Sequence, residues 1–119
     1  MGRYYYGDIE GKFWVAIQSS VAADRFGVKW EEGDFDYVSY DFTSEDLPNV
    51  QDGLSVIEEM NDLEKIESFF SKRSFYSDED LEKAGISREE VSEFADYKLG
   101  KQIEECLIEK GRCSFEAEL

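Results

Sequence analysis

The sequence contains no histidine, a single proline and only two cysteines. Without an imidazole, Ser-His-Asp and Cys-His catalytic arrangements are excluded, as are histidine-based metal sites. A tetrahedral zinc site needs four Cys or His ligands, and Cys106 and Cys113 supply two. No apolar run approaches the ~18 residues that cross a bilayer. We therefore expect no metal, no cofactor and no membrane partner, and we do not expect an enzyme.

Positive charge is also scarce, with 13 Lys and Arg against 29 Asp and Glu, which gives a formal net charge of −16. Binding to phosphate backbones or anionic lipid requires Lys and Arg that displace counterions, so we expect no direct binding of nucleic acid. The partner that this composition favours is a basic protein surface. Residues 1–6 show neither the basic start nor the apolar stretch of a signal peptide, so we expect a cytoplasmic, non-secreted protein.

What the sequence does contain is ample core material. Nine Phe, seven Tyr and two Trp contribute to an apolar fraction of 41% in 119 residues, which is typical of one folded domain rather than a disordered acidic tail. We expect a single domain over 1–119. Its pattern predicts mostly strands in 1–43, mostly helices in 44–111 and a final strand in 112–119.

The first part predicts two hairpins. Residues 3–6 and 12–18 flank a turn with Gly7 and Gly11, and 28–31 and 35–42 flank a second turn. The strand at 12–18 is apolar on both faces, so we expect it in the centre of the sheet. Between the hairpins, 19–27 reads as a polar connection or a short helical turn.

The second part predicts helices at 49–60, 61–72, 78–84 and 88–110. Asn61 with Glu64, and Ser87 with Glu90, have capping-box spacing, and Gly111 suits a helix end. The alternating residues after it predict a half-buried strand that must pair within the sheet. The expected fold is α+β: an antiparallel sheet of four to five strands, an N-terminal β-meander plus the C-terminal strand, packed against three to four helices.

The two cysteines fall at the end of the last helix and in the strand that follows it. Cys106 and Cys113 are seven residues apart. A disulfide across this helix-to-strand turn is conceivable, but two cysteines in a non-secreted chain are more typical of buried small apolar side chains. We expect the second arrangement.

Most of the negative charge falls in the helical part, where 44–119 has a net charge of −12. Carboxylates at three- and four-residue steps along helices can imitate a row of phosphates. In size and charge the chain resembles the acidic inhibitors that phages and other mobile elements make against nucleic-acid-binding defence proteins. The leading hypothesis is a protein-binding protein that acts as a DNA mimic. Its expected partner-binding residues are Glu89, Glu93, Asp96, Glu104, Asp78, Glu79 and Asp80.

The alternative is a small-ligand domain or carboxylate-based enzyme on the aromatic face of the sheet. Asp8 and Glu10 lie two residues apart in a glycine-flanked loop, and paired carboxylates can perform acid–base chemistry. Tyr5 and Trp14 would supply aromatic contacts to a ligand. The aromatic sheet or the terminal strand could also support a homodimer.

Overall fold

The computed structural model describes residues 3–13, 18–28, 30–32, 36–71 and 77–118. Its five strands form one antiparallel sheet in the order β2-β1-β5-β4-β3. In chain order these strands are β1 (Tyr4–Gly7), β2 (Gly11–Lys12), β3 (Glu31–Glu32), β4 (Tyr37–Thr43) and β5 (Arg112–Glu118). The sheet pairs β1 with β2 and β3 with β4, as expected, and the C-terminal β5 lies between these two hairpins.

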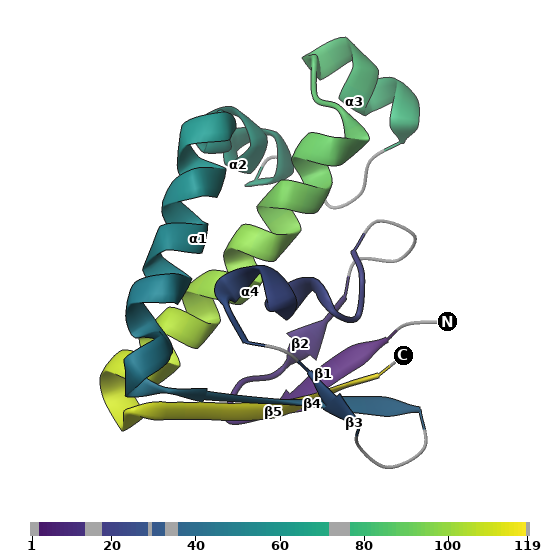
Figure 1. Ribbon diagram of the computed structural model, residues 1–119. Helices are drawn as coiled ribbons and strands as arrows, with labels where there is room; N and C mark the ends of the chain where they lie inside the picture. Colours follow the sequence, from purple (N-terminus) through teal and green to yellow (C-terminus); the bar gives the residue numbers. More distant parts are fainter. Residues whose placement is uncertain (1–2, 14–17, 29, 33–35, 72–76, 119) are drawn as a thin grey trace.

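The helices lie together on one face of this sheet (Figure 1). They are α1 (Leu47–Met60), α2 (Leu63–Ser71), α3 (Asp78–Ala84) and α4 (Arg88–Lys110), with two 3-10 turns, η1 (Ala22–Phe26) and η2 (Ser44–Asp46). The α+β class is therefore confirmed. Among the described helices, none has the length and apolarity that spanning a bilayer requires.

Two local predictions are wrong. The predicted central strand at 12–18 is represented by β2, a two-residue strand at the edge of the sheet, and residues 14–17 lie outside the described part. The central position belongs to β5, whose Cys113 and Phe115 are buried. The helix predicted from Asn61 begins at Leu63, because Asp62 and not Asn61 accepts the Lys65 amide at its N-terminus.

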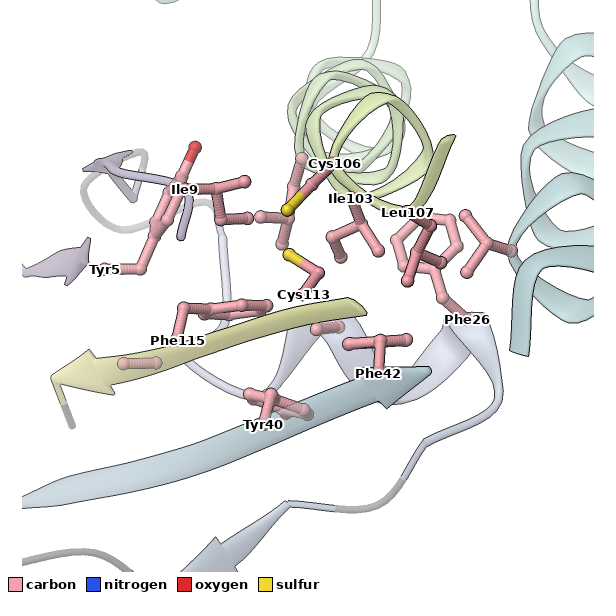
Figure 2. Close-up of a cluster of buried hydrophobic side chains, with 14 of the residues drawn as sticks. Tyr5, Ile9, Phe26, Tyr40, Phe42, Ile103, Cys106, Leu107, Cys113 and Phe115 are labelled. Carbon is pink, nitrogen blue, oxygen red and sulfur yellow. The ribbon is translucent and has the colours of Figure 1, made fainter. Parts of the chain in front are cut away.

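The main core fills the space between the sheet and helices α1 and α4 (Figure 2). Tyr40, Phe42 and Phe115 stack on the inner face of β4 and β5, with ring centroids 5.2 to 6.2 Å apart. Cys106 and Cys113 are buried in the same core as free thiols, and their sulfurs face each other in Figure 2. The expectation of buried small side chains is confirmed for both.

A second, smaller core joins α2, α3 and the start of α4. Its residues are Ile66, Phe69, Leu81, Ile86, Val91 and Phe94. The N-termini of α3 and α4 are closed by capping boxes at Ser77 and Ser87, and both helices end at a left-handed glycine. These caps fix where each helix begins and ends, and so which carboxylates reach the surface.

Candidate functional site

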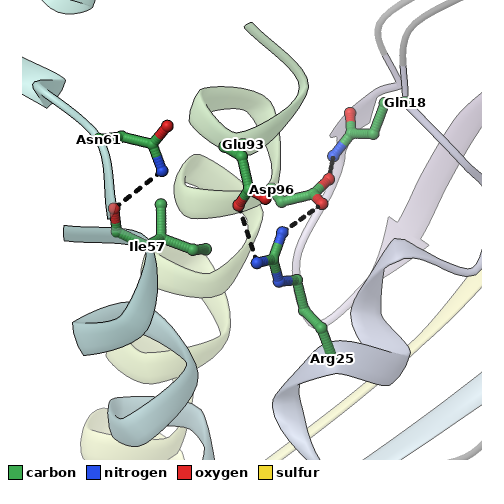
Figure 3. A network of polar contacts seen from close by, with 6 residues as sticks. All are labelled: Gln18, Arg25, Ile57, Asn61, Glu93 and Asp96. Carbon is green, nitrogen blue, oxygen red and sulfur yellow. Dashed lines mark hydrogen bonds and ion pairs between the residues drawn. The ribbon is translucent and has the colours of Figure 1, made fainter. Parts of the chain in front are cut away.

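Arg25 in η1 links the 3-10 turn to the middle of α4 (Figure 3). Its Nη1 donates to Asp96 Oδ2 at 2.9 Å, and its Nη2 lies 2.8 Å from Glu93 Oε2. Gln18 donates from Nε2 to Asp96 Oδ1 at 3.1 Å. Glu93 Oε2 is buried without an aligned hydrogen-bond donor in the described chain, so its contact with Arg25 is an ion pair only. One internal cation therefore holds two of the carboxylates predicted to bind a partner.

Asp96 is the more deeply buried of these two carboxylates, with 9% of the residue exposed. Burial raises the pKa of Asp96 above its ordinary value, whereas the hydrogen bonds from Arg25 and Gln18 and the charge of Arg25 oppose the rise. A carboxylate in this environment is not open to a partner protein. Its contacts instead join η1 and the segment before it to α4.

Two more of the predicted carboxylates have structural partners. Glu104 accepts from Lys101 Nζ at 2.9 Å, and only 15% of its side chain is exposed. Asp80 accepts from the Ser77 amide at 3.1 Å and completes the capping box of α3. The role of Asp80 is consistent with a pattern in the sequence, because a Ser followed three residues later by an acid is a helix-start signal.

The remaining predicted carboxylates are Glu79, Glu89 and Asp78. Glu79 lies 3.6 Å from Lys83 Nζ, but both side chains are about three-quarters exposed, and such pairs contribute little. Glu89 is exposed in the first turn of α4. The side chain of Asp78 lies outside the described part. Glu79 and Glu89 are thus accessible, and their role in partner binding stays a prediction.

The structure exposes a further group of acids where α1 meets α2, which the list of predicted site residues did not include. These junction acids are Glu58, Glu59, Asp62, Glu64 and Glu67, and all of them are exposed. The one cation within their stretch, Lys65, donates from Nζ to Gly85 O at 3.0 Å. Within the described residues, no ion pair of 4.0 Å or less neutralises a junction acid.

A cavity of about 470 Å³ lies between the β1–β2 hairpin and α4. It brings together two residues of the predicted ligand site, Tyr5 and Glu10, with Phe94 and Tyr97 from α4. The Tyr5 hydroxyl donates to Gln102 Oε1 at 2.5 Å, and Gln102 Nε2 donates to the Glu10 carbonyl at 3.2 Å. The cavity therefore has aromatic walls and a fixed amide and hydroxyl pair, which suits a polar molecule of small size.

Lysines also line this cavity, but their charged ends already have contacts within the protein. Lys98 Nζ lies 5.0 Å from the centre of the Phe94 ring, and Lys101 is bound by Glu104. Lys12 Nζ lies 5.8 Å from the Tyr4 ring, which is on the opposite face of the sheet from Tyr5. The lining therefore does not form a concentrated anion site.

The other two residues of the predicted ligand site do not join this group. Asp8 accepts from the Ser114 amide at 3.0 Å and lies 4.0 Å from Lys110 Nζ, so it fastens the loop after β1 to β5 and the end of α4. Trp14 lies outside the described residues. A paired role for Asp8 and Glu10 therefore has no support in their hydrogen bonds. No cluster of three or more potential metal ligands occurs in the described part of the chain.

These features describe an acidic α+β protein with an uneven distribution of unpaired carboxylates and a cavity between its first hairpin and α4. Comparison with protein-family models, with curated proteins and with solved structures finds no match to the chain. The geometry and charge of the protein itself are therefore the basis for a proposed function.

Proposed function

We propose that the protein acts by binding a basic surface of another protein inside the cell, and that it occupies a site where that partner would hold nucleic acid. The observation that carries this proposal is the surplus of exposed carboxylates without a cationic neighbour. Internal ion pairs in the described chain engage Asp8, Glu79, Glu93, Asp96 and Glu104, whereas the net charge is −16. Ion pairs within the protein therefore leave most of its negative charge without a neutralising cation.

The junction acids supply a concentrated part of this field. Residues 58–67 hold five carboxylates and one lysine, and α1 and α2 fix their positions. Exposed charges of one sign attract an oppositely charged partner over about a Debye length, ~8 Å at physiological salt, and mainly increase the association rate. A site that normally binds phosphates offers the matching positive charge.

The test is capture of nucleic-acid-binding proteins from an extract of the source cell on the immobilised protein, followed by elution with short duplex DNA. We expect basic DNA- or RNA-binding proteins to be retained at low salt and released both by the duplex and by 1 M salt, where screening reaches ~3 Å. Retention that the duplex does not compete refutes mimicry. Absence of any retained basic protein, or direct binding of the duplex to the immobilised protein, refutes the proposal as a whole.

Matched charge reversals localise the effect. Glu59→Lys with Glu64→Lys changes two exposed junction acids. Glu105→Lys with Glu109→Lys changes two exposed acids in the C-terminal part of α4. Both variants have a net charge of −12, so a difference between them reports position rather than total charge. We expect the first pair to slow association of the captured partner several-fold more than the second.

The cavity supports a second candidate function, recognition of a small polar molecule. Its specific support is the convergence of Tyr5, Glu10 and Gln102 on one space of about 470 Å³. Such binding would hardly change with salt, because it does not depend on exposed charge. A thermal-shift screen of small metabolites at high salt tests it: a stabilising compound whose effect is lost in Tyr5→Phe supports a ligand site, and no stabilising compound contradicts it.

A further inference from the structure

The face of the sheet opposite the helices carries tyrosines and carboxylates. Every described helix lies on the other side of the sheet (Figure 1). Along β4 and β5 the apolar residues turn inward and the intervening residues turn outward. We define the open sheet face by the outward residues Tyr6, Tyr37, Ser39, Asp41, Glu116 and Glu118.

Two tyrosines form the aromatic part of this face. The rings of Tyr6 and Tyr37 meet edge to face, with centroids 5.9 Å apart and planes at 77°, and Tyr6 is 40% exposed. The hydrogen bond with Tyr37, with smaller effects of burial and of Glu116, raises the pKa of Tyr6 to about 12. Tyr6 is a neutral phenol at physiological pH, and its ring face can attract a cation.

Carboxylates stand beside these rings at spacings that the sheet fixes. Glu116 is opposite Tyr6 on β1 and Ser39 on β4, and Glu118 is opposite Tyr37. Residues two apart on one strand are roughly 6.6 Å apart, and neighbouring strands about 4.8 Å. In the described chain, no ion pair engages Glu116, Glu118 or Asp41.

The same surface already shows how it can hold a cation. Lys12 Nζ lies 5.8 Å from the centre of the Tyr4 ring, next to the open sheet face on β1 and β2. A guanidinium is better suited than an ammonium to a surface of this composition, because it stacks on an aromatic ring while its planar fork donates to a carboxylate. Tyr6 with Glu116, and Tyr37 with Glu118, each offer a ring and a carboxylate together.

We propose that the open sheet face binds an arginine-bearing segment of the basic partner protein. The inference rests on the proposed function, which supplies a basic partner, and adds the place and the chemistry of recognition. The junction acids attract the partner, and the open sheet face holds its guanidinium groups. Charge complementarity carries the assignment, because no ion pair of 4.0 Å or less within the described residues engages the carboxylates of this face.

The experiment compares fluorescent octa-arginine and octa-lysine peptides by anisotropy at low salt. The two probes have equal charge, so their difference isolates the guanidinium. We expect octa-arginine to bind about two- to fivefold more tightly, the ratio that corresponds to the contribution of an exposed cation–π contact. The double variant Tyr6→Leu, Tyr37→Leu should remove this preference and leave octa-lysine binding unchanged. Thermal unfolding of the variant verifies that it is folded.

Amide NMR shifts during the octa-arginine titration locate the site independently of any substitution. Shifts centred on Ser39 and Glu116 support the inference, and shifts confined to the junction acids overturn it. The variant Glu105→Lys, Glu109→Lys, which changes charge away from this face, should keep the arginine preference.

The possible failures are distinguishable. If both peptides bind equally and salt weakens both, the inference is overturned but the proposed function stands. If neither peptide binds, both are overturned. If sedimentation shows a dimer that Tyr6→Leu, Tyr37→Leu dissociates, the open sheet face is an interface between two copies of the chain and the inference is again overturned.

Discussion

Replacement of Gly100 by alanine tests a close packing contact between α4, α1 and η1. Gly100 lies in the middle of α4, where α4 passes α1 and the ring of Phe26 from η1. A Cβ at this position would lie 2.6 Å from Phe26 Cε1 and 2.7 Å from Leu54 Cδ2, and closer still to Phe26 Cζ. Both neighbours are buried, with 0% and 3% of each residue exposed, so neither can swing into solvent.

Two effects of opposite sign decide the outcome. Alanine in place of glycine inside a helix gains about 1 kcal/mol through propensity. An added methyl group in a packed core costs about 1–3 kcal/mol, and separations below 2.8 Å place this site near the upper end. We therefore expect Gly100→Ala to lower the free energy of unfolding by about 1–2 kcal/mol. Ser55→Ala, at an exposed position of α1, is the propensity control and should be neutral or slightly stabilising.

Urea denaturation followed by far-UV circular dichroism measures these changes, with the m-value as a check on two-state behaviour. Phe26→Leu should be destabilising alone but should relieve the clash in Gly100→Ala, which gives a coupling free energy of about 1 kcal/mol or more in a double-mutant cycle. If Gly100→Ala increases stability, or if the two substitutions are additive within about 0.5 kcal/mol, the packing argument fails.

Three further outcomes follow from the buried polar groups and the thiols. Arg25→Met should lower the free energy of unfolding by about 1–3 kcal/mol, less than for a fully buried pair because 29% of the Arg25 side chain is exposed; an unchanged urea midpoint would contradict this. The pKa of Asp96 is raised in the folded protein, so the native state binds its proton more readily than the unfolded state does. The stability of the wild type relative to Asp96→Asn should therefore increase as pH falls from 7 through that raised pKa. A relative loss of stability on acidification would show that the pKa is lowered instead. Burial raises the pKa of Cys113, and Cys106 donates to Arg112 O at 3.3 Å. A thiol reagent should therefore modify neither cysteine until urea unfolds the protein. Rapid modification of either cysteine in the folded protein would disprove their burial.

Much of the fold could be predicted because its signals are local. The capping box at Ser87 and the stop at Gly111 gave the bounds of α4, and strict alternation gave β5. Gly53 lies inside α1 although glycine disfavours a helix, and the reason lies elsewhere in the chain: a Cβ there would approach Phe26 at 2.9 Å. Packing against the ring of Phe26 from η1 therefore favours glycine at position 53, although helix propensity does not.

The candidate site was much less predictable. Periodicity identified Glu93 and Asp96 as helical acids, but it contained no signal that Arg25, about 70 residues earlier, would reach both of them. The same limit applies to Asp8, which is bound to the Ser114 amide. Which carboxylates are neutralised depends on contacts between segments distant in sequence, and spacing along a helix does not encode them.

Composition by itself determined the sign of the surface, the absence of histidine chemistry and the supply of apolar side chains for an α+β core, because these are sums over residues that folding cannot change. The tertiary structure alone decided which charges remain free, since β5 enters between the two hairpins and its Ser114 amide binds Asp8, while η1 carries Arg25 to α4. It also placed every described helix on one face of the sheet, and tyrosines and carboxylates on the other. Charge is additive along a chain, whereas exposure and pairing depend on how distant segments pack.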